Sequence, residues 1–484
     1  MSITGALNNA LSGLAAASRA AEIVASNTAN ATTPGYAKRG LALSAADLGG
    51  RGAGVRIDGV TRQVNDSLLG DLRLATASGG NARLLTGFHS DLEARIGAPG
   101  EAGSLSARLA GFESALIGAA SQPDATLRLT QVLSAAQDVV QQVNGISAHL
   151  ETVRTQADRQ IATQVGVMNT TLVQIADLNR QIVAQRSLGQ DGAALMDQRQ
   201  VLVDKLAEIV PLRTVARDND QIALFTTGGA SLLEGRPAEI GFAPVGLATA
   251  DMTLASRALS GLTLNGMPID SKEGGVLGGG QLGALFTIRD DLAPDAQAQM
   301  DAFARDLIAR FSDPAIDPSL SPGDAGLFTD RGAPFDPLEE VGLAGRLAIN
   351  AAADPGQGGA VWRLRDGLNA ATASDVGDPT LLVSLRAALT DSEPPASGAF
   401  AGLAKTPSGL AADILSMVSG ARQGAAARES YANARQDALT GAFLAEGVDT
   451  DQELQKLLQI EQAYAANARV ITTIDEMIQQ LLRL

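Results

Sequence analysis

Residues 450–484, TDQELQKLLQIEQAYAANARVITTIDEMIQQLLRL, carry the clearest structural pattern in the chain. Its larger side chains recur at alternating intervals of three and four, a heptad pattern that predicts a helix packing in a left-handed coiled coil. Asn467 is the polar member of this seam, and a buried Asn there would fix the register of the pairing. Thr450 and Glu453 form a capping-box pattern at the start of the helix. The seam consists of Leu457, Ile460, Tyr464, Asn467, Ile471, Ile474, Ile478 and Leu481.

A second amphipathic helix is predicted at the other end of the chain. It should end near 27–30, because Thr33 precedes Pro34 and is biased away from helical backbone. Ile23 and Val24 fall outside its apolar stripe. Two such helices at opposite ends of one chain are expected to pair with each other or with neighbouring molecules. The stripe contains Ile3, Leu7, Leu11 and Leu14, and Ser18, Ala21 and Ala25 continue it.

Between the ends, the period of the apolar residues changes twice. Helical spacing runs through 66–208 and includes a seam from Ile161 to Ile182. Strand–turn–strand patterns follow at 212–226 and around Asn265-Gly266. Helical spacing returns at 281–311, with a break expected at Pro294, and again at 408–445. The window 312–403 holds nine of the eighteen prolines, so we expect loops with short elements there.

The fold class predicted from this order is mainly α with a β-rich insertion (α+β). One discontinuous helical bundle interrupted by an insertion explains the order better than a string of independent domains. The predicted parts are terminal coiled-coil helices at 1–40 and 446–484, a discontinuous helical-bundle domain at 41–208, 281–311 and 404–445, a small β-rich domain at 209–280, and a Pro/Gly-rich connecting region at 312–403.

Composition excludes several classes of function. The net charge is −16, which disfavours binding to nucleic acid or to an anionic membrane. The chain has no cysteine, so disulfides, thiolate metal sites and cysteine nucleophiles are excluded. It has two histidines, too few for a histidine-rich metal site, and only 3% aromatic residues. No apolar stretch long enough to span a membrane and no cleavable signal peptide are visible.

A few patterns have a formal functional interpretation. Gly278-x-Gly280-x-x-Gly283 matches the dinucleotide fingerprint, but no strand–helix–strand unit surrounds it, so a glycine hinge is the better interpretation. Asp218 and Asp220 resemble the start of a calcium loop without its continuation, which favours a solvated turn. His89 and His149 stand alone on helical patterns and are expected to be surface or packing residues. We therefore predict no catalytic, cofactor-binding or metal-binding residue.

Passages at both ends resemble the signatures of bacterial flagellar rod, hook and hook-associated axial proteins. ALSGLAA (10–16) and SNTANATTPGY (26–36) resemble the N-terminal signature, and EQAYAANARVI (461–471), followed by IDEM (474–477), resembles the C-terminal one. In addition, LMDQRQVLVDKL (195–206) is similar to a helix of the hook-associated protein 1 family, the first hook–filament junction proteins. Flagellin lacks the Asn-x-x-Asn-x-x-x-Pro-Gly-Tyr passage and fits less well. The resemblance covers roughly 1–310 and 405–484.

The resemblance implies a structural protein, not an enzyme, exported unfolded by the flagellar type III apparatus without a cleaved signal and located outside the cell at the hook–filament junction. Its terminal helices would form an inner axial domain, with 209–280 pointing outward. The implied partners are copies of itself in a ring, the hook protein, the next junction protein, and an export chaperone on the C-terminal helix. Cofactors, nucleic acid and membrane insertion are not expected.

The assembly interface implied in this way consists of the two terminal seams. Two alternatives stay open: another axial protein of hook or distal-rod type, or an enzyme with a nucleotide site at Gly278–Gly283. The interface residues are Ile3, Leu7, Leu11, Leu14, Leu457, Ile460, Tyr464, Asn467, Ile471, Ile474, Ile478 and Leu481.

Overall fold

The computed structural model describes residues 3–48, 51–272 and 274–483. The chain is 61% helical with small separate sheets, which confirms the predicted class of a mainly α protein with a β insertion. It divides into two compact units, each assembled from distant stretches of the sequence. Unit 1 consists of 1–80, 166–240 and 431–484, and unit 2 of 81–165 and 241–430.

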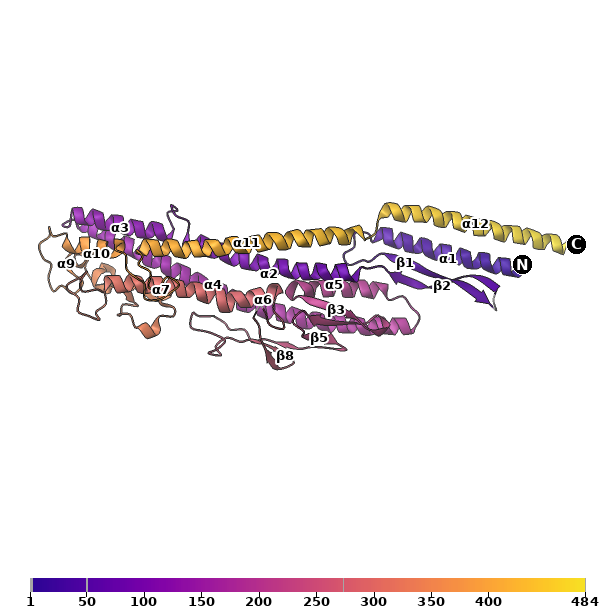
Figure 1. Ribbon diagram of the computed structural model, residues 1–484, viewed down its shortest axis with the longest axis horizontal. Coiled ribbons are helices and arrows are strands. Elements are labelled where there is room, and N and C mark those ends of the chain that lie inside the picture. Colours follow the sequence, from indigo (N-terminus) through magenta and orange to yellow (C-terminus); the bar gives the residue numbers. More distant parts are fainter. Residues whose placement is uncertain (1–2, 49–50, 273, 484) are drawn as a thin grey trace. The chain divides into compact units, whose positions relative to one another are not determined.

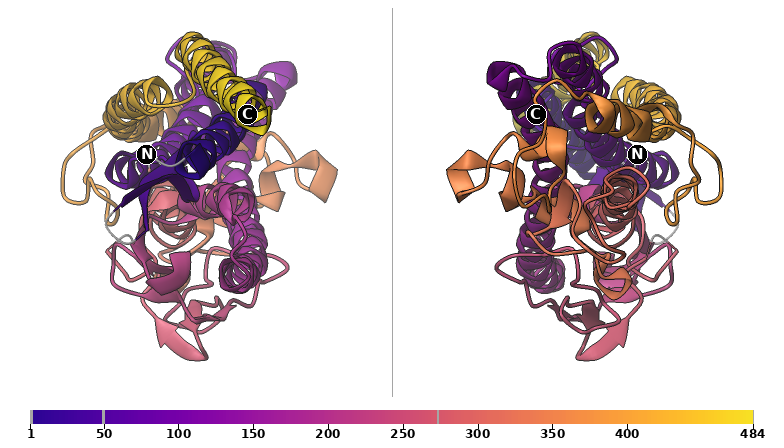
Figure 2. Two further views of the ribbon diagram at one scale, coloured as in Figure 1. Left: turned by 90° about the vertical axis from the view of Figure 1, so that its right-hand side faces the viewer. Right: turned by 90° about the vertical axis from the view of Figure 1, so that its left-hand side faces the viewer.

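In unit 1, the two ends of the chain lie side by side. Helix α1 (Ile3–Ala29) runs along helix α12 (Thr450–Leu482). On its other side, α1 contacts the antiparallel hairpin of β1 (Arg39–Leu48) and β2 (Arg51–Arg62), so that α1 lies between α12 and the hairpin (Figures 1 and 2). We call α1 and α12 the terminal pair. Its pairing within one chain agrees with the first of the two arrangements expected from the sequence.

The hairpin corrects the sequence interpretation, which placed residues 41–208 in the helical domain. Residues 39–48 and 51–62 are instead paired strands, with the register interrupted between Ala42 and Leu43 and again between Ala45 and Asp47. The period-two pattern of Leu41 and Leu43, and of Val55 and Ile57, is the signal that was missed. It is weak because each strand is short of apolar residues, and the hairpin is stabilised by packing on α1.

Four helices follow the hairpin and confirm the helical pattern predicted for 66–208. The long α4 carries the predicted seam, and Ile161, Met168, Leu172, Ile175 and Ile182 in that seam are completely buried. The four helices are α2 (Asp66–Ile96), α3 (Leu105–Ser121), α4 (Thr126–Ser187) and α5 (Ala193–Ile209).

The β-rich stretch forms two sheets rather than one. The first, in unit 1, has the order β3-β4-β5-β6 and begins with the predicted pairing of Leu212–Ala216 with Ile222–Thr226. The second has the order β7-β8-β9, and its last two strands form the predicted hairpin around Asn265-Gly266, where both residues have positive φ. The strands are β3 (Leu212–Ala216), β4 (Ile222–Thr226), β5 (Ser231–Glu234), β6 (Arg236–Pro237), β7 (Ile240–Gly241), β8 (Leu262–Leu264) and β9 (Met267–Ile269).

Helical structure then resumes as predicted for 281–311, but without the break expected at Pro294. Helix α6 (Gly280–Thr287) passes through a π-helical turn, η2 (Ile288–Leu292), into α7 (Ala293–Phe311). Pro294 lies in the first turn of α7, where a missing amide hydrogen and a fixed φ are tolerated. The extra residue of the π turn therefore accommodates the proline.

The proline-rich window 312–403 has short elements, as expected. Buried arginines hold its loops: Arg310 donates to the carbonyl oxygens of Ala388, Asp391, Glu393 and Lys405. Phe112, Phe311 and Phe328 form an aromatic cluster, with ring centroids 5.0–5.9 Å apart. The elements are β10 (Phe328–Asp330), η3 (Pro337–Glu339), α8 (Leu343–Arg346), β11 (Leu347–Ile349), η4 (Ala351–Ala353), η5 (Pro355–Gln357), α9 (Arg363–Asp366) and α10 (Thr380–Thr390).

Helix α11 (Pro407–Ala445) leads from this window to α12 and agrees with the helix predicted at 408–445. Among the described residues, no helix combines the length and the apolar character needed to cross a bilayer.

Candidate assembly interface

The terminal pair meets at a glycine. A Cβ atom added to Gly13 would lie 2.8 Å from Nδ2 of Asn467, so the Asn467 amide occupies the space that the missing side chain leaves. Asn467 donates to the carbonyl oxygen of Ala463, one turn back on its own helix. The polar residue of the seam is therefore half-buried against α1 of the same chain.

The predicted interface residues divide into three groups by burial. Ile474 is buried, at 3% exposure. Those that are half-buried are Ile3, Leu7, Leu14, Ile460, Asn467, Ile471 and Ile478. The remaining four, exposed at 38–60%, are Leu11, Leu457, Tyr464 and Leu481.

The face of α1 that is buried differs from the predicted stripe. It consists of Ala10, Ala16, Ala17, Ile23, Val24 and Asn27, and so includes the two residues thought to lie outside the stripe. The reason is that α1 packs on two sides: Gly13 faces α12, while the Ser12 hydroxyl accepts a hydrogen bond from the Val55 amide of the hairpin. Small side chains allow both neighbours to approach closely, and an apolar-period analysis gives alanine little weight.

Apolar side chains also cover the outer surface of α12. Leu454, Leu458 and Leu482 are 53%, 59% and 81% exposed, and Val470 and Met477 are more than 40% exposed. Of the described residues of this helix, only Glu453 and Ile474 are buried. A surface of this kind can form hydrophobic contacts with other protein subunits.

The start of α12 is joined to the end of α1 by a buried polar network. Nδ2 of Asn27 donates to Oε2 of Glu453 at 3.0 Å and to the carbonyl oxygen of Arg39 at 2.9 Å. Its Oδ1 accepts from the Tyr36 hydroxyl and from the Arg39 amide. Glu453, 1% exposed, also accepts from Lys456, and the Lys38 ammonium lies 3.6 Å away. The passage SNTANATTPGY thus folds around Asn27, and the hydrogen bond from Asn27 to Glu453 connects the end of α1 to the start of α12.

This network overturns the predicted capping box. The residue before the helix is Asp449, whose carboxylate accepts from the amides of Asp451 and Gln452. Thr450 is the first residue of the helix, and the Glu453 side chain turns inward to Asn27 instead of back to the helix start. Asp is an effective N-cap, so Glu453 is available for the tertiary contact.

The charge of Glu453 is maintained by its partners. Burial acts to raise its pKa, but the hydrogen bonds from Asn27 and Lys456 and the charges of Lys456 and Lys38 outweigh burial and lower the pKa. The carboxylate is therefore ionised at neutral pH and can hold both lysines and the amide.

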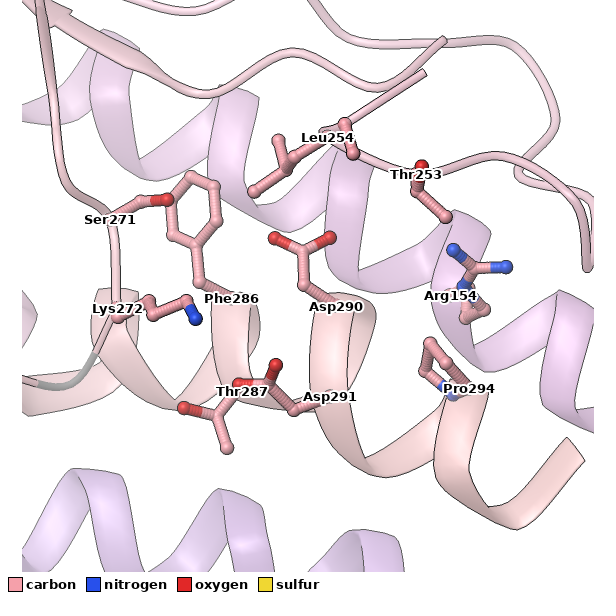
Figure 3. A pocket seen from close by; sticks show the side chains of 11 residues that line it. Arg154, Thr253, Leu254, Ser271, Lys272, Phe286, Thr287, Asp290, Asp291 and Pro294 are labelled. Atoms are coloured by element: carbon pink, nitrogen blue, oxygen red, sulfur yellow. The ribbon is translucent and has the colours of Figure 1, made fainter. Parts of the chain in front are cut away.

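A pocket in unit 2 provides a test of the enzyme alternative (Figure 3). It has a volume of about 220 Å³ and is lined by residues from α4, α6, η2, the start of α7 and the loops before α6, but not by Gly278, Gly280 or Gly283. Two of its charged side chains have partners: Arg154 donates to the carbonyl oxygens of Thr249, Met252 and Arg289, and Asp290 accepts from Arg289. Lys272 and Asp291 line it as well.

The glycine segment itself turns the chain into α6. Gly279 and Gly280 have φ of 80° and 59°, and a Cβ on Gly283 would lie 3.4 Å from the Gly278 carbonyl carbon. Positive φ and close backbone approach explain the glycines without a ligand. Asp218 and Asp220 lie in the turn between β3 and β4, where Asp220 forms an ion pair with Arg186.

His89 and His149 are half-buried on helices. Burial lowers the pKa of both imidazoles, aided by Arg428 at His89 and by Arg95 at His149, so both are neutral at pH 7. Within the described part of the chain, no group of three or more His, Cys, Asp or Glu residues is placed to hold a metal ion.

The residues that sequence reasoning missed are Asn27 and Glu453. Asn27 belongs to the passage 26–36, and Glu453 belongs to the predicted capping box. The signal that could have pointed to them is that each is a polar residue at the end of a predicted helix. Their contact spans 426 positions of the chain, so no local pattern could pair them.

Three family models match the chain. "Flagella basal body rod protein" matches residues 7–36, "Flagellar hook-associated protein FlgK helical domain" matches 90–314, and "Flagellar basal body rod FlgEFG protein C-terminal" matches 440–484. The two terminal models describe rod proteins, whereas the model across the middle is specific to hook-associated protein. The middle therefore distinguishes the chain from hook and distal-rod proteins.

The chain is also similar to curated proteins that are named flagellar hook-associated protein 1. The chain is similar to flagellar hook-associated protein 1 of Salmonella typhimurium, at 27% identity over 48% of this chain and 43% of the relative. The Bacillus subtilis protein is 27% identical over 47% of each chain, and the Escherichia coli protein is 25% identical over 48% and 43%. The chain thus matches a little under half the length of these relatives.

The solved structure of the flagellar hook junction protein FlgK from Burkholderia pseudomallei is also similar. It covers 54% of this chain and 46% of its own, with 20% identity and a TM-score of 0.44. With a helical-domain model across its middle, rod-protein models at its two ends and curated relatives of one name, the chain belongs to the family of flagellar hook-associated protein 1.

Proposed function

We propose that this protein is a structural component of the bacterial flagellum that joins the hook to the filament by self-assembly through its terminal pair. The observation that carries the proposal is the surface of α12, which presents Leu454, Leu458 and Leu482 to solvent although the helix is packed on α1. A large exposed apolar surface favours contacts with further subunits. The role is structural and requires no catalysis.

The same proposal includes the partners. Copies of the chain pack laterally as a ring, the hook protein lies below the ring, and the next junction protein lies above it. The chain reaches this place by type III export, and an export chaperone binds α12 before assembly. An exposed apolar helix needs such protection from aggregation during transit.

The experiment replaces exposed leucines of α12 without disturbing the pairing with α1. The double variant Leu458→Ser and Leu482→Ser should keep the thermal midpoint of the monomer, because both side chains are mostly exposed. Cells that carry it should be non-motile and should release filament subunits into the medium, as electron microscopy and analysis of the culture medium can establish.

The matched control is Leu338→Ser, because Leu338 is 93% exposed in unit 2. This variant should retain motility. Normal filaments in cells with the α12 variant would contradict the proposed role of the helix surface. Labelling of a tagged protein away from the hook–filament boundary would contradict the proposed location.

A further inference from the structure

The loop that follows α1 lies against helix α5. Gly35 has φ of 76°, and a Cβ there would lie 2.4 Å from Cγ2 of Val201. The Ala37 amide donates to Oδ1 of Asp197 at 3.3 Å. The passage 26–36 and the passage 195–206, two of the conspicuous stretches of the sequence, are therefore in contact within unit 1.

Asp197 lies where two like charges meet. Arg39 and Arg62 are direct partners across the base of the hairpin, in the register of β1 and β2. Like charges in directly opposed strand positions are destabilising. Asp197 accepts from both: from Nε of Arg62 at 2.7 Å and from Nη2 of Arg39 at 3.2 Å. One carboxylate on α5 thus neutralises the repulsion at the base of the hairpin.

The neighbouring lysine faces the other helix. Lys38 lies 3.6 Å from Glu453 on α12, while Arg39 pairs with Asp197 on α5. Successive side chains of an extended segment point to opposite sides, so two adjacent cations connect the chain to two different helices. The side chains of Arg39, Arg62 and Asp197 are only 13–18% exposed, which limits screening of these ion pairs by salt.

We propose that Asp197 is the positioning residue that seats the terminal pair on α5, by collecting the Ala37 amide and the guanidinium groups of Arg39 and Arg62. We call this group of four residues the Asp197 joint. Its consequence for the junction rests on the proposed function: subunits pack in register only if the terminal pair is held in one orientation on the helix that carries it. A sequence pattern around 195–206 then reflects a docking site for the hairpin base rather than the helix alone.

Because the chain has no cysteine, spin labels attach only to cysteines that are introduced by mutation. Labels at Lys205→Cys on α5 and Gln459→Cys on α12, both exposed, report the orientation of the terminal pair in the full-length protein. With Asp197 intact, pulsed dipolar spectroscopy should give one narrow distance distribution. In Asp197→Asn, the distribution should broaden, and amide exchange in residues 33–40 should accelerate about tenfold or more, because the negative charge and one of the two acceptor oxygens are lost.

Asp204→Asn is the matched control. Asp204 lies two turns further along α5 and pairs with Arg73 of α2, at 2.7 Å, outside the joint. Its removal should leave the distance distribution narrow. If Asp197→Asn does not fold, Arg62→Gln keeps the Arg39–Asp197 pair and should broaden the distribution to a smaller extent. Unchanged distances in the Asp197→Asn protein, or in Arg62→Gln where that variant is needed, would overturn the joint.

Motility separates the joint from the proposed function. Broadened distances together with poor filament attachment would support both the joint and its role in assembly. Broadened distances with normal motility would retain the joint as a structural feature and overturn its role in assembly. The surface variant Leu458→Ser and Leu482→Ser tests the proposed function independently, since it leaves the joint intact.

Discussion

The helices α12 and α7 show how differently the two units use their apolar residues. In α7, 12 of 19 residues are buried, among them Phe303 and Phe311. In α12, which has 33 residues, only Glu453 and Ile474 are buried, and several leucines face solvent. Helix α7 therefore buries most of its apolar side chains within the chain, whereas α12 leaves many of its apolar side chains exposed.

Unit 2 and the terminal pair of unit 1 are therefore stabilised by different kinds of contact. Unit 2 buries aromatic rings and pairs its buried charges internally, as in the Arg289–Asp158 ion pair, where both side chains are completely buried. The terminal pair depends on small residues and on one polar network for its internal contacts. It leaves apolar surface exposed, as the proposed self-assembly requires.

The largest effect is expected from the buried charge of unit 2. Arg289→Gln leaves Asp158 with the Val245 amide but without its cation, and should reduce the free energy of unfolding by about 3–5 kcal/mol. Urea denaturation measures this loss. Hydrogen exchange in α12 should not change, because the site belongs to the other unit.

Arg108→Gln is the control in the same unit, because the Arg108–Asp138 pair is 38% and 41% exposed. It should cost about 0–1 kcal/mol, as exposed ion pairs do. An equal loss in the free energy of unfolding for both variants would contradict the expectation that the buried ion pair matters more than the exposed one.

A smaller effect is expected at Glu453, in the terminal pair. Glu453→Gln should weaken the contact between the two ends by about 1–3 kcal/mol, because the amide of Gln cannot replace the charged acceptor for Lys456 and Lys38. Faster exchange in residues 27–39 and 450–460 would report it. Glu461→Gln, on the exposed face of the same helix, is the control and should have no effect.

The same residue predicts a dependence on pH. The folded-state pKa of Glu453 is below its ordinary value of 4.5, so its stabilising effect is complete above that value and is lost as the pH falls through the lowered pKa. Hydrogen exchange at the two ends, corrected for its intrinsic pH dependence, should therefore accelerate below about pH 4.5. A Glu453→Gln protein that shows the same acceleration would assign the effect to another carboxylate.

A fourth prediction concerns the contact between Gly13 and Asn467. Gly13→Ala places a methyl group against the Asn467 amide and should destabilise the terminal pair by about 1 kcal/mol, since overpacking exceeds the gain in helix propensity. Adding Asn467→Ala should restore most of the loss, as a double-mutant cycle can measure. Asn467→Ile places a larger side chain against Gly13 and should also separate the helices.

Gly70→Ala is the matched control, because a Cβ on this helical glycine has no neighbour within 4 Å. It should stabilise the protein by about 0.5–1 kcal/mol through helix propensity alone. If Gly13→Ala were as stabilising as Gly70→Ala, the close approach of the two helices would be wrong.

The smallest effect on stability is expected on the outer face of α1. Leu11 is 51% exposed, and Leu11→Ser should change the free energy of unfolding by less than about 0.5 kcal/mol. Motility should nevertheless decrease if this leucine contacts another subunit. Val376→Ser, at a 59% exposed position in unit 2, should affect neither quantity. A loss of stability in Leu11→Ser would place the residue inside the monomer fold.

Much of the fold could be predicted from local patterns. The helices at both ends, the seam from Ile161 to Ile182 and the strand pairing of 212–226 each depend on residues a few positions apart, so periodicity identifies them. The strand pairing of 39–48 with 51–62 was missed because the strands have few apolar residues and a bulged register. The buried face of α1 was missed because Ala10 and Ala17 become core residues only when two neighbours approach them.

The residues predicted for the assembly interface differ in how far α1 covers them. The seam of α12 faces α1 at Ile474 and Asn467, whereas Tyr464 and Leu481 are exposed. A heptad pattern identifies which residues share a face, but it does not say how much of that face the partner helix covers. The exposed leucines of α12 lie in the same segment as the seam, and their spacing does not distinguish them from the seam residues.

Local sequence patterns were enough to predict that both ends are amphipathic helices, that a β-rich stretch interrupts a helical chain, and that the ends resemble flagellar axial proteins. Only the tertiary structure decided that Asn27 binds Glu453 and that Asp197 neutralises Arg39 and Arg62. The physical reason is the range of the interactions. Helix and strand periods arise between neighbours along the chain, whereas the partner of a buried charge can lie hundreds of residues away and is chosen only when the chain has folded.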